Sequence, residues 1–230
     1  MGAPPRAEPP PSRWVFPPLH DADPDGPVVL GGDLEPGTLL AAYRSGLFPM
    51  PIGRRRLGWW SPDPRGVIPV GPRAVAAGTA LHVSRSLRRS LRRFTATVDA
   101  DFEAVMRACG DPRRPHGWID EKFVGAYTEL HRRGWAHSVE VWEDDQLVGG
   151  VYGVSIGAFF AGESMFHRAT DASKAALVHL TDRFAHVEHA LFDVQWLTPH
   201  LASLGAVEIP RSEYLTRLAS AVSRPVDPFS

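Results

Sequence analysis

Apolar side chains recur at intervals of three and four residues along much of this 230-residue chain, a spacing that places them on one face of an α-helix. Phe102, Val105, Met106 and Cys109 show this pattern, and Gly110 then provides a helix end. The same reasoning predicts further helices at residues 36–45, 84–94, 123–134, 172–185 and 212–223.

Short apolar runs predict strands at residues 138–142, 147–154, 158–166 and 190–196. Asp144-Asp145 and Ile156-Gly157 supply tight turns between the first three runs. Residues 48–72 are dense in proline, glycine and tryptophan, which favours an irregular platform over a helix or a strand. Helices, an antiparallel meander, a helix and another strand together predict the α+β fold class.

Composition refines this picture. Hydrophobic residues make up 43% of the chain, enough for a sizeable core, but residues 1–12 are rich in proline and are predicted to form a disordered tail. The formal net charge is -1, so any affinity for nucleic acid must come from a local patch. Cys109 is the single cysteine, which excludes an internal disulfide and fits a reducing compartment.

The chain shows no apolar run close to the ~20 residues that a membrane-spanning helix needs. Its first residues also lack the apolar core of a signal peptide. We therefore expect a cytoplasmic protein that makes no membrane contact, with a monomer as the default state.

The predicted helix at residues 84–94 carries the clearest charge pattern. Its basic face consists of five arginines, namely Arg85, Arg88, Arg89, Arg92 and Arg93. Like charges at this spacing cost roughly 0.2–0.5 kcal/mol per pair, and no acidic residue between His82 and Phe94 offsets them. A solvated face or an anionic membrane are alternative interpretations. The opposite face has only three apolar residues, and arginine suits bidentate phosphate contacts, so a phosphate backbone is favoured.

Several further motifs recur in a fixed order between Gly31 and Leu218. They are Gly31-Gly32-Asp33-Leu34, Tyr43-Arg44-Ser45-Gly46-Leu47-Phe48-Pro49, Trp59-Trp60-Ser61-Pro62-Asp63-Pro64-Arg65, His82-Val83-Ser84-Arg85-Ser86, Trp118-Ile119, Ala136-His137-Ser138-Val139-Glu140-Val141-Trp142, Leu147-Val148-Gly149-Gly150, Gly162-Glu163-Ser164-Met165-Phe166, Ala172-Ser173-Lys174, Asp193-Val194-Gln195, His200-Leu201-Ala202-Ser203-Leu204-Gly205-Ala206 and Glu208-Ile209-Pro210-Arg211. Because these motifs occur in this order and spacing, the chain resembles the leucyl/phenylalanyl-tRNA–protein transferase family.

The resemblance implies a small N-terminal domain, residues 13–66, and a catalytic domain, residues 67–230, similar to the acyl-CoA N-acyltransferase fold of acetyl-CoA-dependent N-acetyltransferases. It also implies a reaction. Leucine or phenylalanine, and methionine less well, would pass from aminoacyl-tRNA to the N-terminal amine of a protein beginning with lysine or arginine. That protein would thereby be marked for degradation, with no ATP, metal or coenzyme consumed.

One observation separates this reaction from acetyl-CoA chemistry. The turn that holds the coenzyme pyrophosphate in N-acetyltransferases has the spacing R-x-x-G-x-G/A, because its backbone N–H groups must approach the phosphates. Here Arg168 is followed by Ala169-Thr170-Asp171-Ala172-Ser173-Lys174, with no glycine. The sequence therefore disfavours an acetyl-CoA donor and is compatible with an acyl group carried by RNA.

The same resemblance assigns Gln195, Asp193 and Glu163 to catalysis. Gln195 would hold the aminoacyl carbonyl, and the two carboxylates would complete a polar network around the amines. Asp193 and Gln195 are two residues apart, so on a strand they share a face, and the same holds for Glu163 and Met165. From spacing alone, Asp193 is a buried carboxylate bonded to backbone N–H groups and Gln195 a hydrogen-bonding residue at a strand end.

Two further sets of substrate-binding residues follow from the resemblance and from residue type. An apolar pocket for the donor side chain is expected from Val151, Phe160, Met165 and Phe184. Taken singly, each is core. The terminal adenosine needs an aromatic platform, and Trp118 stands at the family position for it. Where the family has a second tryptophan this chain has Met50, so Met50 itself, Trp59 or Trp60 would take that role.

Two other functions and a metal site remain as alternatives. An acetyl-CoA-dependent N-acetyltransferase is the first, and a non-enzymatic RNA-binding module that uses the arginine helix is the second. Neither accounts for residues 162–166 together with residues 193–195. His179, His186 and His189 could gather around a metal, but no cysteine joins them, so we expect solvated helix-end histidines and no metal or cofactor.

Overall fold

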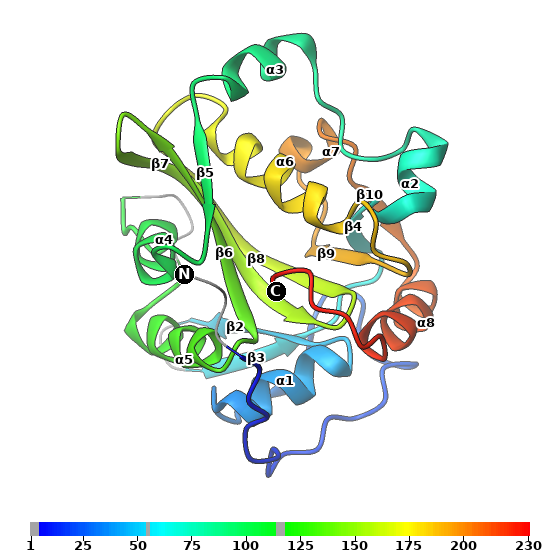
Figure 1. The fold of residues 1–230 in the computed structure, drawn as a ribbon. Coiled ribbons are helices and arrows are strands. Elements are labelled where there is room, and N and C mark those ends of the chain that lie inside the picture. Colours follow the sequence, from blue (N-terminus) through cyan, green and yellow to red (C-terminus); the bar gives the residue numbers. More distant parts are fainter. Residues whose placement is uncertain (1–4, 54–55, 114–117) are drawn as a thin grey trace.

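A computed structural model describes residues 5–53, 56–113 and 118–230. Its main sheet has seven strands in the order β10-β4-β9-β8-β7-β6-β5, and a smaller sheet has the order β1-β3-β2 (Figure 1). The strands are β1 (Pro27–Leu30), β2 (Phe48–Ile52), β3 (Arg56–Trp60), β4 (Arg65–Ile68), β5 (Thr95–Val98), β6 (Ala136–Glu143), β7 (Gln146–Ile156), β8 (Phe159–His167), β9 (Leu191–Gln195) and β10 (Val207–Ile209).

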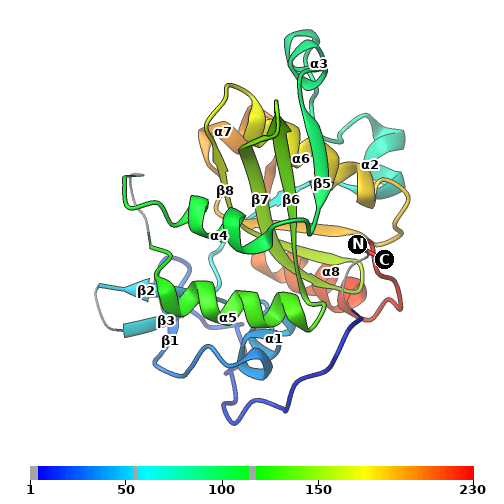
Figure 2. The same cartoon turned by 60° about the vertical axis from the view of Figure 1, so that its left-hand side comes forward.

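Helices cover both faces of the main sheet. The helices of the described residues are α1 (Pro36–Arg44), α2 (Gly71–Ala77), α3 (Arg85–Leu91), α4 (Phe102–Cys109), α5 (Glu121–Arg132), α6 (Ala172–Phe184), α7 (Pro199–Ala202) and α8 (Arg211–Val222). Figures 1 and 2 show α6 across one face and α4 and α5 on the other. Two apolar cores result, one beneath α6 and one beneath α4 and α5, and the α+β prediction is confirmed.

The smaller sheet corrects the prediction for residues 48–72. Instead of an irregular platform, this stretch contributes β2, β3, β4 and the start of α2. Pro49 and Pro51 mislead the sequence argument because β2 is an edge strand, where a residue without an N–H is tolerated. Strand β4 belongs to the main sheet, so the predicted domain boundary after residue 66 falls within this strand.

Both ends of the described chain lie against the body. Residues 1–12 are predicted to be a disordered tail, yet Ala7 donates a 2.9 Å hydrogen bond to the Arg133 carbonyl and accepts a 2.9 Å bond from the Trp135 indole. Arg6 forms an ion pair of 3.3 Å with Asp227 near the other end. Residues 1–4 of this predicted tail lie outside the described residues. Backbone hydrogen bonds, an ion pair and the buried Pro9 hold the following residues against the body.

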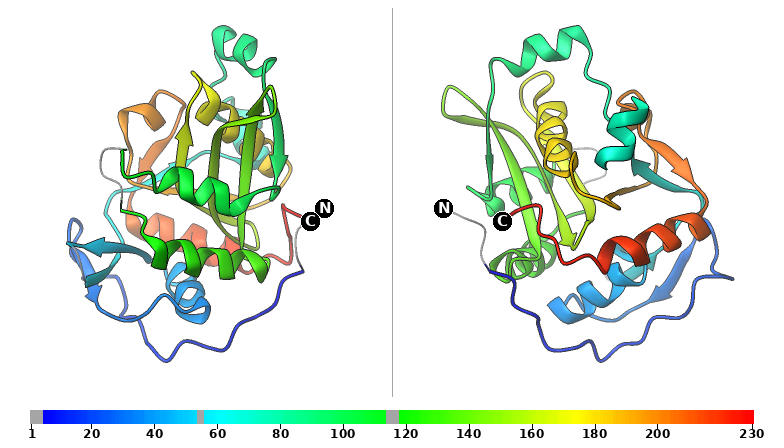
Figure 3. Two further views of the ribbon diagram at one scale, coloured as in Figure 1. Left: turned by 90° about the vertical axis from the view of Figure 1, so that its left-hand side faces the viewer. Right: turned by 45° about the vertical axis from the view of Figure 1, so that its right-hand side comes forward.

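Helix α8 packs beside α1, as the two views of Figure 3 show. Within the described residues, no helix has both the length and the apolarity to cross a membrane.

Candidate active site

The polar residues singled out in the sequence meet where two strands part. Strands β8 and β9 are parallel, and their pairing ends with Ala161 opposite Asp193. Glu163 and Gln195 each lie two residues beyond that point, and Figures 1 and 2 show the two strands running in different directions there. The end of this ladder therefore brings the two predicted residues to the same opening in the sheet.

A β-bulge sets the direction of Glu163. The pairing of β7 with β8 shifts between Tyr152 opposite Ser164 and Gly153 opposite Gly162, which leaves Glu163 as the additional residue. Its carboxylate consequently points toward the α4–α5 side, while Met165 packs into the core beneath α6. The prediction that Glu163 and Met165 share a face is wrong, because the extra residue breaks the two-residue alternation.

Asp193 is wholly buried and held by an arginine. Its two carboxylate oxygens accept hydrogen bonds of 2.8 and 2.6 Å from Arg65, and the Tyr214 hydroxyl donates a further bond of 3.0 Å. Burial is the largest single influence and acts to lower the pKa of Arg65, but the charges of Asp193, Tyr214 and Glu163 and the hydrogen bonds to Asp193 together outweigh it, and the pKa is raised. The side chain predicted to act in catalysis is thus already engaged by protein groups.

The same carboxylate shapes the backbone of Gln195. Asp193 Oδ1 accepts a 2.9 Å bond from the Gln195 N–H, and Gln195 adopts a left-handed φ of 60°. The chain then passes so close to Gly66 that a β-carbon there would lie 2.9 Å from the Leu197 nitrogen. Glycine at position 66 therefore permits the sharp turn that directs the Gln195 side chain.

The Gln195 side chain presents a donor without a partner. Gln195 is 7% exposed, and its Nε2 has no hydrogen-bond partner among the described residues. A buried amide N–H without a partner costs about 1–3 kcal/mol, so such a group in a folded protein calls for an explanation. An acceptor oxygen supplied by a substrate would satisfy it.

Two tyrosines surround Glu163. The Tyr127 hydroxyl donates a 3.2 Å bond to Glu163 Oε2, and the Tyr43 and Tyr127 hydroxyls lie 2.5 Å apart. Burial is the main cause that raises the pKa of Glu163 to about 8, although bonds from the two tyrosines oppose it. Desolvation also raises the pKa of both tyrosines. Glu163 is therefore mainly a neutral acid at pH 7, able to give and take a proton near physiological pH.

The four predicted pocket residues gather in one place. Val151, Phe160 and Phe184 are buried in the core beneath α6, and Met165 packs against them. The rings of Phe160 and Phe184 lie 6.0 Å apart. This apolar group lies on the α6 side of the sheet.

The smaller sheet presents an aromatic face to this site. Phe48 pairs with Trp60 and Met50 with Gly58, so these side chains share a face. Trp196 follows Gln195 directly, is 39% exposed, and lies 5.0 Å from Phe48 and 6.0 Å from Trp60 between ring centroids. Met50 and Trp60, two of the predicted stacking residues, therefore lie on one face, and Trp196 is a residue that the sequence analysis missed.

Trp59 and Trp118 have different surroundings. Trp59 is 1% exposed, its indole N–H donates a 2.8 Å bond to the Gly31 carbonyl, and Phe16 packs on its ring. It is a core residue and cannot stack on a base, which corrects its place among the substrate-binding candidates. Trp118 is half-buried and packs at 5.1 Å on Phe123, which in turn stacks on Tyr127.

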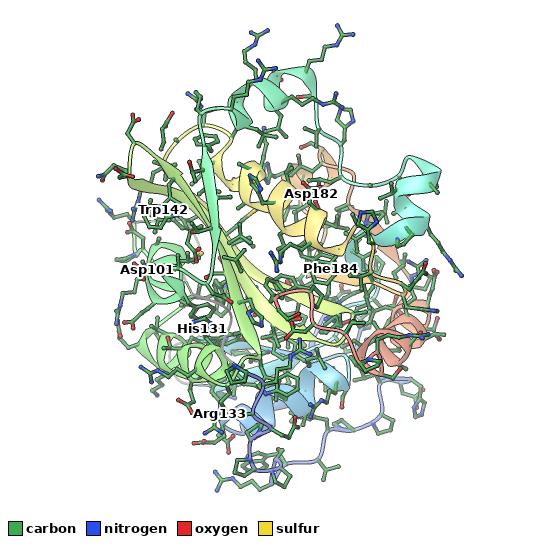
Figure 4. All side chains as sticks on the ribbon, viewed as in Figure 1. Asp101, His131, Arg133, Trp142, Asp182 and Phe184 are labelled. Atoms are coloured by element: carbon green, nitrogen blue, oxygen red, sulfur yellow. The ribbon has the colours of Figure 1, made fainter. Side chains whose placement is uncertain are left out.

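The arginines of the predicted basic helix are exposed, but the helix is shorter than expected. It is capped by Ser84, ends at Leu91 and packs through Leu87. Arg92 and Arg93 therefore follow the helix rather than extending its stripe, and Arg93 lies 3.7 Å from the Glu143 carboxylate. Side chains ending in nitrogen extend from α3 away from the body in Figure 4. The other four arginines form no salt bridge within the described residues; they are Arg85, Arg88, Arg89 and Arg92.

The sequence analysis missed Arg65, Tyr43, Tyr127 and Tyr214 as members of the site. Arg65 carried a signal, because a buried carboxylate such as Asp193 needs a cation and Arg65 closes one of the quoted motifs. The three tyrosines gave none, since their contacts join distant parts of the chain. No group of three histidine, cysteine or acidic side chains is placed to hold a metal ion in the part of the chain that is described.

Comparison with known proteins identifies the family of this chain. A profile described as "Leucyl/phenylalanyl-tRNA protein transferase" matches residues 75–219. The chain belongs to that family. The profile of the N-terminal domain of leucyl/phenylalanyl-tRNA protein transferase matches residues 32–63. The chain is therefore an aminoacyltransferase, and the resemblance predicted from its motifs is confirmed.

Relatives named leucyl/phenylalanyl-tRNA–protein transferase match nearly the whole chain. Those from Aromatoleum aromaticum and Nitrosospira multiformis are both 48% identical, covering 90% and 92% of this chain and 87% and 90% of their own. The relative from Tolumonas auensis is 47% identical over 90% of this chain and 88% of its own. Among solved structures, L-PGS from Bacillus licheniformis covers 61% of this chain and 50% of its own at 11% identity with a TM-score of 0.37.

Proposed function

We propose that this enzyme transfers leucine or phenylalanine, and methionine less well, from aminoacyl-tRNA to the N-terminal amine of proteins that begin with lysine or arginine. The transfer would mark those proteins for degradation. The observation that carries the proposal is the convergence of Glu163 and the unpartnered Gln195 amide at the end of the β8–β9 ladder.

The chemistry requires positioning more than strong acid or base. The amine nitrogen forms a bond to the ester carbonyl carbon, the carbon–oxygen bond to the ribose breaks, and one proton passes from nitrogen to the ribose oxygen. Alignment of the two reactants contributes roughly 7–11 kcal/mol at the extreme. An α-amine with a pKa near ~8 is neutral often enough at pH 7 to react.

Each site residue then has a defined task. Gln195 Nε2 donates a hydrogen bond to the carbonyl oxygen, which gains negative charge as the amine attacks. Glu163, with a pKa of about 8, exchanges a proton with the amine or the ribose oxygen. Asp193 serves as a positioning residue, because Arg65 and Tyr214 occupy it while it holds the Gln195 backbone.

The donor is bound at three places. Its side chain enters the apolar group beneath α6, formed by Val151, Phe160, Met165 and Phe184. Its terminal adenosine stacks on aromatic rings, for which Trp118 and the exposed Trp196 are placed best. Stacking on a ring contributes ~1–3 kcal/mol per base. The phosphate backbone meets the exposed arginines of α3 and the turn after it.

An acetyl-CoA donor is the second candidate, since the catalytic part is proposed to be similar to the acyl-CoA N-acyltransferase fold. A coenzyme pyrophosphate would bind at the N-terminus of α6. Asp171 stands at the N-cap position there without a capping bond from its side chain, and its hydrogen bonds from Lys174 and Ser90 lower its pKa and keep it ionised. A negative charge there repels a pyrophosphate, which favours the tRNA donor.

No bound cofactor enters the proposed reaction, and we propose that the enzyme works as a cytoplasmic monomer. The deciding experiment mixes labelled Phe-tRNA with one peptide that begins with arginine and another that begins with alanine. Label on the first peptide alone supports both the reaction and the acceptor rule. Turnover of acetyl-CoA without turnover of any charged tRNA would refute the proposal.

A further inference from the structure

The C-terminal segment brings a phenylalanine to the donor pocket. Phe229 is 3% exposed and its ring lies 5.6 Å from Phe160 and 6.2 Å from Phe184, both predicted pocket residues. Figure 4 shows the segment passing beside Phe184. The Phe229 ring also stacks on the His137 ring, with the ring centroids 4.1 Å apart and the ring planes 5° from parallel. Phe229, which is 45 positions after Phe184 in the sequence, thus packs in one aromatic group with Phe160 of β8 and Phe184 of α6.

Specific bonds hold this segment in place. The Arg183 Nε donates a 2.7 Å bond to the Pro228 carbonyl, and its guanidinium lies 5.3 Å from the Phe229 ring. Asp227 accepts a 3.0 Å bond from the Phe229 N–H and forms the ion pair with Arg6. The backbone just before Phe229 and the ring itself are therefore both held by contacts with the rest of the protein.

We infer that Phe229 forms a wall of the pocket for the donor side chain and sets the choice between leucine and phenylalanine. This inference rests on the proposed function. Phe160 touches both the pocket group and Phe229, so the position of the Phe160 ring, and with it the depth of the pocket, depends on Phe229. Apolar pockets discriminate by size, roughly 10–200-fold for one methylene group.

The test is a competition between Leu-tRNA and Phe-tRNA for transfer to one arginine-initiated peptide. Phe229→Leu removes ring volume and gives the larger donor more room, so the ratio of phenylalanine to leucine transferred rises about tenfold. The matched control is Phe102→Leu. Phe102 is also 3% exposed and also stacks on a histidine, His131, at 4.4 Å, but it lies in the core beneath α4 and α5.

The control is expected to lower both transfers equally and leave the ratio as in the wild type. Should Phe229→Leu be too unstable to assay, Phe229→Met removes a similar volume with a side chain that adapts its shape to the surrounding core, and the ratio shifts in the same direction. An unchanged ratio in an active Phe229 variant overturns the inference. A wild-type protein inactive with every charged tRNA refutes the proposed function instead, so the two failures are distinct.

Discussion

Gln195 combines a left-handed backbone with a buried amide that finds no partner in the described protein. Replacement by alanine removes the donor that we propose for the developing oxyanion, and kcat/KM is expected to fall roughly 10²–10³-fold. Initial rates with Phe-tRNA and an arginine-initiated peptide provide the measurement. The other glutamine of the chain, Gln146, is exposed on β7, and Gln146→Ala should retain full activity. Equal losses in both variants would contradict the assignment.

The raised pKa of Glu163 predicts a pH dependence of stability. Between its ordinary pKa of 4.5 and about 8 in the folded protein, the folded state binds more protons than the unfolded state. Stability from this group is therefore full below pH 4.5 and is lost as the pH rises through 8, by up to several kcal/mol. Glu163→Gln should remove that loss, as measured by denaturant unfolding at pH 5, 7 and 9. An exposed control, Glu103→Gln, should keep the wild-type slope.

The Arg65–Asp193 pair makes a different prediction, because both partners are buried. Asp193→Asn leaves the Arg65 charge without its counter-ion, and the free energy of unfolding should fall by about 3–5 kcal/mol. In the pair of Asp227 with Arg6 the side chains are 28% and 21% exposed, so Asp227→Asn should cost no more than ~1 kcal/mol. Comparable losses in denaturant titrations would show that burial does not decide the strength of these pairs.

At the scale of elements, α3 is a short helix whose arginine side chains are exposed to solvent. Arg88→Glu combined with Arg92→Glu should sharply reduce use of aminoacyl-tRNA while sparing a small aminoacyl-adenosine donor, which lacks the phosphate backbone. Arg132→Glu with Arg224→Glu reverses two exposed charges at the C-terminal ends of α5 and α8, helices that lie far from α3 in Figure 1, and should spare both donors. Equal loss with both donors in the α3 variant would show that α3 acts on folding or chemistry instead.

Helices and strands with a regular apolar period could be predicted from the sequence, as the agreement for α4, α5, α6 and β6 to β8 shows. The short strands β1 to β5 and β10 could not, because their proline-rich or brief sequences form strands only through pairing with distant partners. The same applies within the site. Glu163, Asp193 and Gln195 came from motif resemblance, whereas the contacts of Tyr127 and Arg65 depend on tertiary structure that no local pattern encodes.

For the whole molecule, the formal charge of -1 means that attraction to RNA must be local. If the four unpaired arginines at α3 each neutralise a phosphate, the logarithm of the tRNA affinity should fall with the logarithm of salt concentration with a slope of roughly -3. Binding measured between 50 and 200 mM salt gives the slope. A slope near zero would exclude this surface as the RNA contact, and the α3 double variant should flatten it.

The bulge in β8 also has an evolutionary consequence. One inserted residue places Met165 on the same side of the sheet as Phe160, while Glu163 faces the other side. Under the proposed function, mutations beneath α6 would alter which amino acid is accepted without disturbing proton transfer, and mutations among the tyrosines would alter turnover without changing that choice. Donor choice and turnover rate could then evolve separately, because they would depend on residues on opposite faces of β8.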